Sequence, residues 1–346
     1  MRRLAGQGPD VNRERGGISV IVAILMVVLL GFAALAVDIG MLYSERTQLR
    51  NGSDAAALAV AQKCAKDAND PECSATSALA RSLASSNAGD GLSNVQSLTL
   101  DKAARTVTVT AGAQEAGKEP NQVSLFFARA LGINTTEVAA ASTVQWGSPL
   151  AGPTAFPVTF SICQVQNHVD RTLQLLQNHG SNANPDCFYG PSGAPVSGGF
   201  GWLTSEPGVC GGLIDLDVAE AGSDPGNSGA PDVCLAILQR WATDMTAGKD
   251  VVVLLPVFDE VSGTGSGAVY GLKSFAAFKV QGWKFSGNDD LPKSFRNTTA
   301  YVSSSVACAG NCRGIIGSFI KYVSLADGFT LGPVDAHGAT IVRLTQ

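Results

Sequence analysis

Charged side chains are scarce in this 346-residue chain, where Asp, Glu, Lys and Arg together make up 15% of the residues. Acidic residues outnumber basic ones, and the formal net charge is −5. Four arginines lie within the first 16 residues, and no basic cluster follows them. A chain without a basic patch lacks the electrostatic footprint of a nucleic-acid-binding protein, so we expect no nucleic acid among its partners.

Histidine is almost absent, which limits both metal chemistry and acid–base catalysis. Only His168, His179 and His337 occur, and none stands at zinc-ligand spacing. The chain also lacks the GxSxG and HExxH motifs. We therefore predict no catalytic residue, no metal and no cofactor, and we do not expect an enzyme.

Two stretches resemble ligand sites in composition only. The Gly-rich run at residues 263–267 lacks the GK[ST] ending of a phosphate-binding loop and precedes a strand-like segment, so a loop tip is the simpler interpretation. Asp215, Asp217 and Glu220 offer carboxylate oxygens, but the EF-hand spacing is missing. A solvated loop is favoured over a calcium site.

The most prominent feature of the sequence is one long apolar run. Residues 17–37 contain no charge, and as a helix they would extend about 32 Å, the thickness of a bilayer hydrocarbon core. A cleaved signal peptide and a buried core helix are the alternatives, but the run is longer than either requires. We predict a single-pass membrane helix. Arg13 and Arg15 precede it, which predicts a cytoplasmic tail over residues 1–16 and export of the rest.

The helical pattern continues past the membrane span. Residues 38–63 contain no proline, and their apolar positions recur at helical spacing, with Asn51-Gly52 as the one weak point. Behind this helix we expect a short helix, a hairpin of two strands from the alternating pattern of residues 95–110, a helix over residues 123–131 and a further strand. These elements predict a small α+β domain over residues 38–147 that packs on the projecting half of the helix.

A Pro- and Gly-containing stretch over residues 148–157 predicts a linker. Beyond it, residues 158–346 have many strand-like segments separated by Gly-, Pro- and Ser-rich loops. The fold class is therefore α+β, with a transmembrane helix, an extramembrane helix, a small α+β domain and a mostly β exported domain.

All eight cysteines follow the apolar run, on the side where oxidising conditions are expected. An even number of exported cysteines predicts up to four disulfides, whose pairing the sequence does not choose among 105 possibilities. Proximity favours Cys64 with Cys73, and either Cys308 with Cys312 or a pairing of one of them with Cys163 is open. The candidates are Cys64, Cys73, Cys163, Cys187, Cys210, Cys234, Cys308 and Cys312.

The N-terminal helix carries an uncommon string. The run ends in D-x-G at Asp38 and Gly40, and a Q-L-R-N-x-x-D-A-A-A-L-A sequence follows from Gln48. This string resembles the N-terminal signature of the Tad (tight adherence) family of Flp pilus-assembly proteins, in its TadG-like group. The residues that carry the resemblance are Gly17, Asp38, Gly40, Gln48, Leu49, Asn51, Asp54, Ala55 and Ala56.

The resemblance implies a bacterial protein of the cytoplasmic membrane with a pilin-like domain and a role in pilus assembly and secretion. Its expected partners are the membrane and other pilus-assembly or pilin proteins, and we expect residues 48–59 to be an assembly element as well as a tether. Pilins of that system carry a Glu at the fifth position after their peptidase site. No Glu follows Gly17 in the apolar run, so we expect Gly17 to stay attached. The alternative is a surface adhesion module that binds a ligand and is anchored by one helix.

Overall fold

The computed structural model describes residues 14–165, 172–177, 200–204, 207–218, 220–224, 232–263, 267–287, 292–323, 329–335 and 338–345. Its contacts divide the chain into two compact units. The first unit comprises Met1–Cys64, Asn69–Val144 and Leu344–Gln346. The second comprises Ala65–Ala68 and Gln145–Arg343.

One helix, α1, runs without interruption over Glu14–Lys66 and is 53 residues long. It does not break at Asn51-Gly52. A Cβ atom on Gly52 would lie 3.1 Å from the carbonyl oxygen of Ala84 in α2 (Ala78–Ser86), so this glycine allows the second helix to approach closely. Ser77 begins α2, and its hydroxyl accepts the N–H of Ala80 at 3.1 Å.

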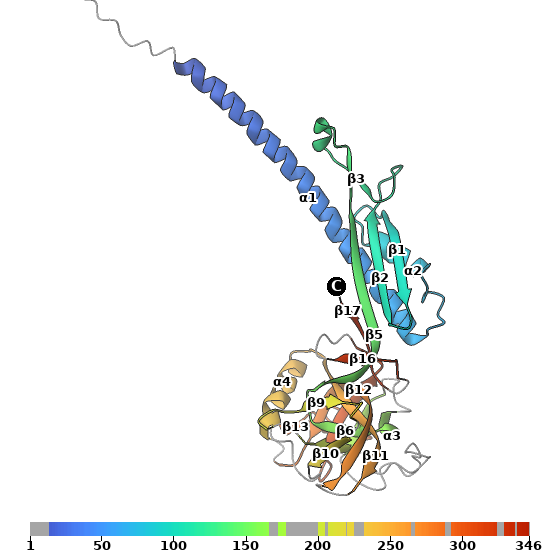
Figure 1. Cartoon of the computed structure of the whole chain (residues 1–346). Helices are drawn as coiled ribbons and strands as arrows, with labels where there is room; N and C mark the ends of the chain where they lie inside the picture. The colour runs from blue at the N-terminus through green and yellow to red at the C-terminus, as the bar shows by residue number, and fades with distance from the viewer. Residues whose placement is uncertain are drawn as a thin grey trace, which may run out of the picture. The chain divides into compact units, whose positions relative to one another are not determined.

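The first unit places α1 against a small antiparallel sheet. Strands β1 (Ser93–Asp101) and β2 (Thr106–Ala113) form a hairpin, and β5 (Ala139–Thr154) lies beside β2. A two-stranded ribbon, β3 (Gln122–Ser124) and β4 (Thr135–Glu137), precedes β5. Figure 1 shows α1 along this sheet, with its N-terminal part extending beyond the strands. Leu49 of α1 packs against buried residues of β2, β3 and β5.

The helix predicted over residues 123–131 is not formed. The chain instead makes β3, a loop and a single 3-10 turn, η1 (Ala128–Leu131). Two interactions prevent a longer helix. Residues 122–124 pair with β4, and the N–H groups of residues 126–128 bond to a side chain of α1. Gly132, with φ of 86°, then ends the turn.

The linker predicted over residues 148–157 is mostly strand. The second half of β5 pairs with β9 (Gly212–Asp215) and β16 (Thr330–Gly332), and the boundary between the units falls between Val144 and Gln145. Pro149 and Pro153 occupy register positions opposite Leu331 and Leu213. Proline can take such positions because it lacks only the backbone N–H and keeps its carbonyl acceptor. A Pro- and Gly-rich composition therefore gave a misleading signal at this position.

The second unit is built mainly of strands. Its long strand β12 pairs with β10, β11, β13 and β14, and β6 runs parallel to β11. The pairs β10–β8, β8–β6, β6–β11, β11–β12 and β12–β10 close a ring of five strands. The elements are β6 (Val158–Ser161), α3 (Ile162–Val165), β7 (Gln174–Gln177), β8 (Phe200–Leu203), β9 (Gly212–Asp215), β10 (Glu220–Asp224), η3 (Asp232–Cys234), α4 (Leu235–Thr246), β11 (Val251–Ser262), β12 (Val269–Lys284), β13 (Ser294–Phe295), β14 (Gly314–Ile320), β15 (Tyr322–Val323), β16 (Thr330–Gly332) and β17 (Thr340–Leu344).

An aromatic core fills this second unit. Phe156 lies 5.4 Å from the ring of Trp202 and 5.2 Å from that of Trp241, which α4 contributes. Trp202 and Trp283 are almost completely buried. The predicted fold class is confirmed, since a long apolar helix leads into mixed α+β structure that is mostly strand and is tied by disulfides.

Candidate functional site

The two halves of α1 have opposite environments. In residues 18–37 every large apolar side chain is exposed, and Val27 reaches 70%. This helix is long and apolar enough to cross a membrane. It is the one such helix in the described part of the chain. The helix therefore fits a single-pass membrane anchor.

Burial begins at Asp38, the first residue after the apolar run. Its carboxylate is 3% exposed and accepts four hydrogen bonds from a loop of the sheet. The N–H groups of Phe126 and Phe127 lie 3.0 and 3.1 Å from Oδ1, and those of Phe127 and Ala128 lie 3.0 and 2.7 Å from Oδ2. We call this arrangement the Asp38 lock.

The lock also determines the charge state of its carboxylate. Burial alone would raise the pKa of Asp38, but the backbone N–H donors of Ala128, Phe127 and Phe126 outweigh it and hold the pKa below 3.8, its ordinary value. A carboxylate at the start of a helical turn also satisfies N–H groups that have no partner inside the turn. Asp38 is thus an ionised cap for η1.

The signature string of α1 divides between its two faces. Leu49 is 1% exposed and packs with Ala111, Ala113, Val123, Val138 and Ala140. Ala56 is fully buried, and Ala55 is half-buried. Gln48 accepts the N–H of Gly89 through Oε1. These residues hold the unit together, so the string is not a contact surface along its whole length.

Asp54, Asn51 and Gly40 lie at the surface or near it. Asp54 forms an ion pair with Arg50 at 3.2 Å, and Asn51 is exposed. Gly17 lies in α1. A Cβ on Gly40 would meet nothing within 4 Å, so no contact among the described residues explains this glycine.

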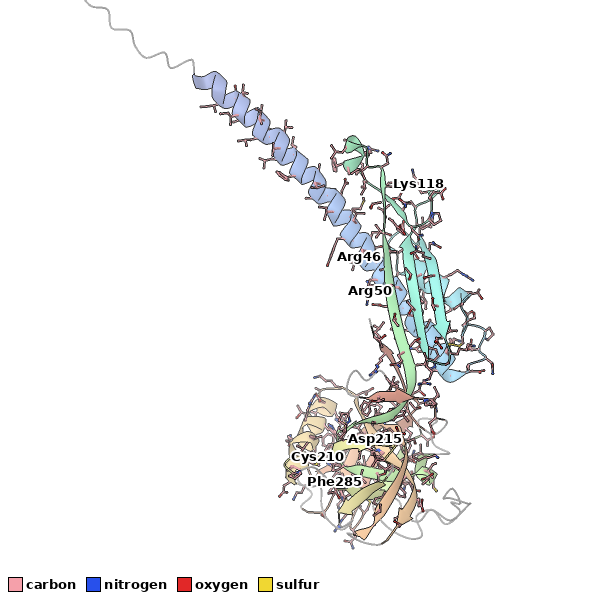
Figure 2. The ribbon with its side chains drawn as sticks, in the orientation of Figure 1. Arg46, Arg50, Lys118, Cys210, Asp215 and Phe285 are labelled. Atoms are coloured by element: carbon pink, nitrogen blue, oxygen red, sulfur yellow. A yellow bond between two sulfur atoms is a disulfide. The ribbon has the colours of Figure 1, made fainter. Side chains whose placement is uncertain are left out.

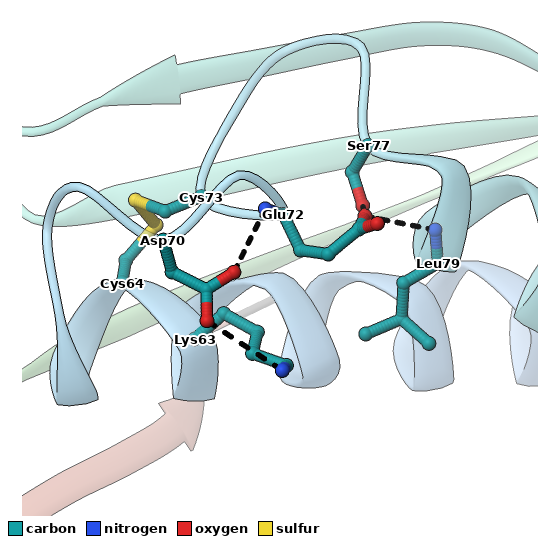
Figure 3. A network of polar contacts seen from close by, with 7 residues as sticks. All are labelled: Lys63, Cys64, Asp70, Glu72, Cys73, Ser77 and Leu79. Atoms are coloured by element: carbon teal, nitrogen blue, oxygen red, sulfur yellow. Dashed lines mark hydrogen bonds and ion pairs between the residues drawn. A yellow bond between two sulfur atoms is a disulfide. The ribbon is translucent and has the colours of Figure 1, made fainter.

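A second set of interactions holds the other end of α1, and we call it the distal clasp. Figure 3 shows the disulfide between Cys64 and Cys73, together with the ion pair between Lys63 and Asp70 at 3.5 Å. The carboxylate of Glu72 accepts the Ser77 hydroxyl at 2.6 Å and the Leu79 N–H at 2.9 Å. The Ser77 hydrogen bond, followed by the Leu79 N–H, lowers the pKa of Glu72 against the effect of burial. The clasp joins α1 to the start of α2.

The remaining cysteines lie in the second unit. Cys210 pairs with Cys234, and Cys308 pairs with Cys312. Cys163 is disulfide-bonded as well, while Cys187 lies outside the described residues. The three histidines also lie outside them.

A groove follows α1 on the side that carries its exposed residues. It is about 370 Å³ in volume and lies between Tyr43, Arg46 and Arg50 of α1 and residues 139–141 of β5. A second hollow of about 350 Å³ continues it toward Ile39 and shares Tyr43, Arg46 and Ala139. Figure 2 shows Arg46 and Arg50 on the helix beside β5, and Arg50 donates to the carbonyl of Ala141 at 2.9 Å. We call this surface the α1–β5 groove.

A hollow of about 340 Å³ in the second unit is lined by residues that include Lys249, Asp250 and Lys279. Its lysines are already paired, because Lys279 bonds to Asp250 at 2.7 Å and Lys249 bonds to Asp244 at 3.4 Å. Asp215 and Asp217 are exposed, and the described ranges hold no group of three His, Cys, Asp or Glu residues that could bind a metal.

Sequence reasoning missed the Asp38 lock and the groove. Asp38 was noticed as a signature residue, but nothing in its neighbourhood points to a loop 88 to 90 positions away. The adjacent Phe126 and Phe127 were the usable signal in the sequence, because an amphipathic helix there would have buried one of the two rings. In the structure Phe126 is 60% exposed and Phe127 is 40% exposed. The groove depends on the pairing of distant segments, which no local pattern encodes.

The comparisons with known proteins agree with the resemblance seen in the helix. Residues 16–63 match the family model described as Tad, "Putative Flp pilus-assembly TadE/G-like". This match confirms the resemblance over the helix that carries the Asp38 lock and one wall of the groove. No curated protein and no solved structure matches the chain.

Proposed function

Because residues 16–63 match a pilus-assembly family, we propose that this protein is a membrane-anchored component of a bacterial Tad/Flp-type pilus-assembly apparatus. Its role is structural, through protein–protein contacts and without a catalytic step. The α1–β5 groove is the contact surface for another pilus-assembly or pilin protein. The family match supports the pilus-assembly role, and the groove on the matched helix is the observation that carries the contact site.

The chemistry of the groove supports this assignment. Tyr43 is 75% exposed and Ile39 is 57% exposed, although both belong to the same helix as the buried Leu49. Exposed aromatic and arginine side chains beside an apolar hollow are the residue types that dominate protein interfaces. Arg46 favours an acidic or carbonyl-rich segment as the bound element, whereas Arg50 is already bonded to Asp54 and to the carbonyl of Ala141.

The proposal includes an orientation. The arginines before the apolar run favour a cytoplasmic N-terminus in the cytoplasmic membrane, and the chain after Val37 would then lie outside the cytoplasm. Disulfides in both units support this orientation, because such bonds persist in oxidising compartments.

The experiment replaces the chromosomal copy in the source bacterium with Tyr43→Ala/Arg46→Glu. We expect loss of pili and of surface adherence, with unchanged amounts of protein in the membrane fraction. Lys118→Glu is the matched control, since it reverses a charge in the same unit at the loop seen in Figure 2, away from the groove. Normal pili in the groove variant would show that the groove is not the contact site. Normal pili after gene deletion would overturn the pilus-assembly role.

The alternative of an anchored ligand-binding module predicts a different result. Cells with the groove variant would then keep normal adherence. Measuring pili and adherence in the same strains separates the two functions.

A further inference from the structure

The loop held by the Asp38 lock exposes an unusual number of apolar side chains. Four of them lie within residues 126–133, and their exposed fractions are 60% for Phe126, 40% for Phe127, 81% for Leu131 and 54% for Ile133. An aqueous environment would make this exposure unfavourable, because exposed apolar surface is costly to hydrate. Contiguous exposed apolar patches mark interaction sites.

The backbone of this loop is prepared for a poorly hydrated environment. Asp38 accepts the N–H groups of residues 126–128. The N–H groups of Leu125, Ala130, Gly132 and Ile133 bond to carbonyls of the loop itself at 2.9 to 3.2 Å. Unpaired backbone groups are costly in lipid, so a loop can enter the bilayer boundary only if most of its N–H groups are paired.

The Asp38 lock also fixes the level of the loop along α1. Asp38 follows Val37, the last residue of the apolar run, and its oxygens lie within 3.1 Å of the loop's N–H groups. If residues 17–37 span the hydrocarbon core, the loop lies at the edge of that core. Figure 1 shows η1 at the end of the first unit's sheet that lies toward the apolar half of α1.

We propose that residues 125–133 form a membrane-interface loop, in which Phe126, Phe127, Leu131 and Ile133 insert into the lipid boundary beside the exit of α1. The occupant of this apolar surface is thus lipid, because the surface continues directly from the lipid-facing half of the helix. Arg129 lies 5.2 Å above the Phe126 ring, where an arginine can reach lipid phosphate while its apolar neighbours are inserted.

The loop gives the protein a second point of attachment to the bilayer. A single helix leaves its extramembrane domain free to tilt, whereas a helix and a fixed loop define a plane of contact. The first unit would then present the α1–β5 groove at a constant height above the membrane. The inference rests on the membrane anchoring of the proposed function but not on a role in pilus assembly.

The test uses the full chain in liposomes of phosphatidylcholine and phosphatidylglycerol that contain an alkyne-tagged lipid. The photoreactive residue benzoylphenylalanine replaces Leu131, and lipid attached to the protein is measured after irradiation. Leu92 is the matched control, because it is 38% exposed in the same unit but lies close to Gly89. Gly89 bonds to Gln48, which is about 15 Å along the helix from Asp38.

Leu25, in the apolar run, is the second reference position. We expect strong lipid labelling at Leu25, and labelling at Leu131 that is about tenfold above that at Leu92. If Leu25 is labelled but labelling at Leu131 does not exceed that at Leu92, the loop does not insert into lipid, although the helix still does. Cross-links from Leu131 to a second protein chain in place of lipid would assign the surface to a protein partner. A lack of labelling at Leu25 would remove both the anchor and the loop.

A further variant separates insertion from general damage. Asp38→Ala with the photoreactive residue at position 131 is expected to lower lipid labelling at that position and leave Leu25 labelling unchanged. Equal labelling with and without Asp38 would show that the lock does not position the loop.

Discussion

Asp38 and Phe127 lie 89 positions apart in the sequence, yet the N–H of Phe127 lies 3.1 Å from one oxygen of the Asp38 carboxylate and 3.0 Å from the other. This relationship ties the end of the apolar run to the α+β unit that follows. Together with the distal clasp near Cys64, it holds the projecting half of α1 at two places. The projecting half of the helix is therefore fixed to its own unit near both ends.

The first prediction concerns the Asp38 lock itself. Asp38→Ala removes the acceptor of three backbone N–H groups, and we expect hydrogen exchange at residues 126–128 to become about tenfold faster or more. Asp38→Asn keeps one acceptor oxygen and should give a smaller change. Exchange in β1 and β2 is the internal reference. Unchanged exchange at residues 126–128 in the alanine variant would contradict the lock.

The second prediction is the pH dependence of the same contact. The folded pKa of Asp38 lies below 3.8, so its contribution to stability is fully present above the unfolded pKa and is lost as the pH falls through the folded value. The amide chemical shifts of Phe127 and Ala128 should therefore titrate together on acidification, with a midpoint below 3.8. A midpoint at or above that value would show that the hydrogen bonds do not outweigh the effect of burial.

The third prediction separates the buried and exposed faces of α1. Leu49→Ala leaves a cavity among small core residues and should lower the free energy of unfolding by about 2 to 5 kcal/mol. Tyr43→Ala removes a side chain that is 75% exposed and should change it by about 0.5 kcal/mol or less. Pulse proteolysis in detergent micelles measures both. Similar losses for the two variants would mean that the helix is not divided as described.

The fold could be predicted from the sequence wherever one local pattern controlled the structure. The uninterrupted apolar run and its polar continuation gave α1, and the alternation around residues 95–110 gave the β1–β2 hairpin. Residues 123–131 have an equally clear helical pattern, but pairing with β4 and bonding to Asp38 override it. Residues 148–154 have a loop-like composition, but partners from β9 and β16 are available to them. Local propensity failed where distant partners competed for the backbone.

The candidate site could be predicted only in part for the same reason. The signature string identified the helix, and a match over residues 16–63 confirms it. The string did not show that Leu49 and Ala56 face the interior while Tyr43 and Arg46 face the groove, because that division depends on where the sheet lies. A substitution of Leu49 or Ala56 by Asp would therefore disrupt the unit's own core and would not report on partner contacts.

The fourth prediction concerns the distal clasp. The Cys64–Cys73 disulfide closes a short loop, with a separation of 9 residues. Its removal by Cys64→Ser/Cys73→Ser should cost about 2 to 3 kcal/mol in local stability. We expect faster hydrogen exchange in the last two turns of α1 and throughout α2. Cys308→Ser/Cys312→Ser is the control and should leave both helices unchanged. An unchanged exchange rate in the first variant would show that the Glu72 hydrogen bonds suffice to hold α2.

The fifth prediction compares two glycines of α1 whose surroundings differ. A Cβ on Gly40 would meet nothing within 4 Å, so Gly40→Ala should stabilise the helix by up to about 1 kcal/mol through its higher helix propensity. A Cβ on Gly52 would lie 3.1 Å from the Ala84 carbonyl oxygen, and the branched side chain of Gly52→Val should force α2 away at a cost of about 1 to 3 kcal/mol. Hydrogen exchange of α2 distinguishes the two, since only the Gly52 variant should accelerate it. If both substitutions left α2 unchanged, the close approach of the helices would not be what requires a glycine at position 52.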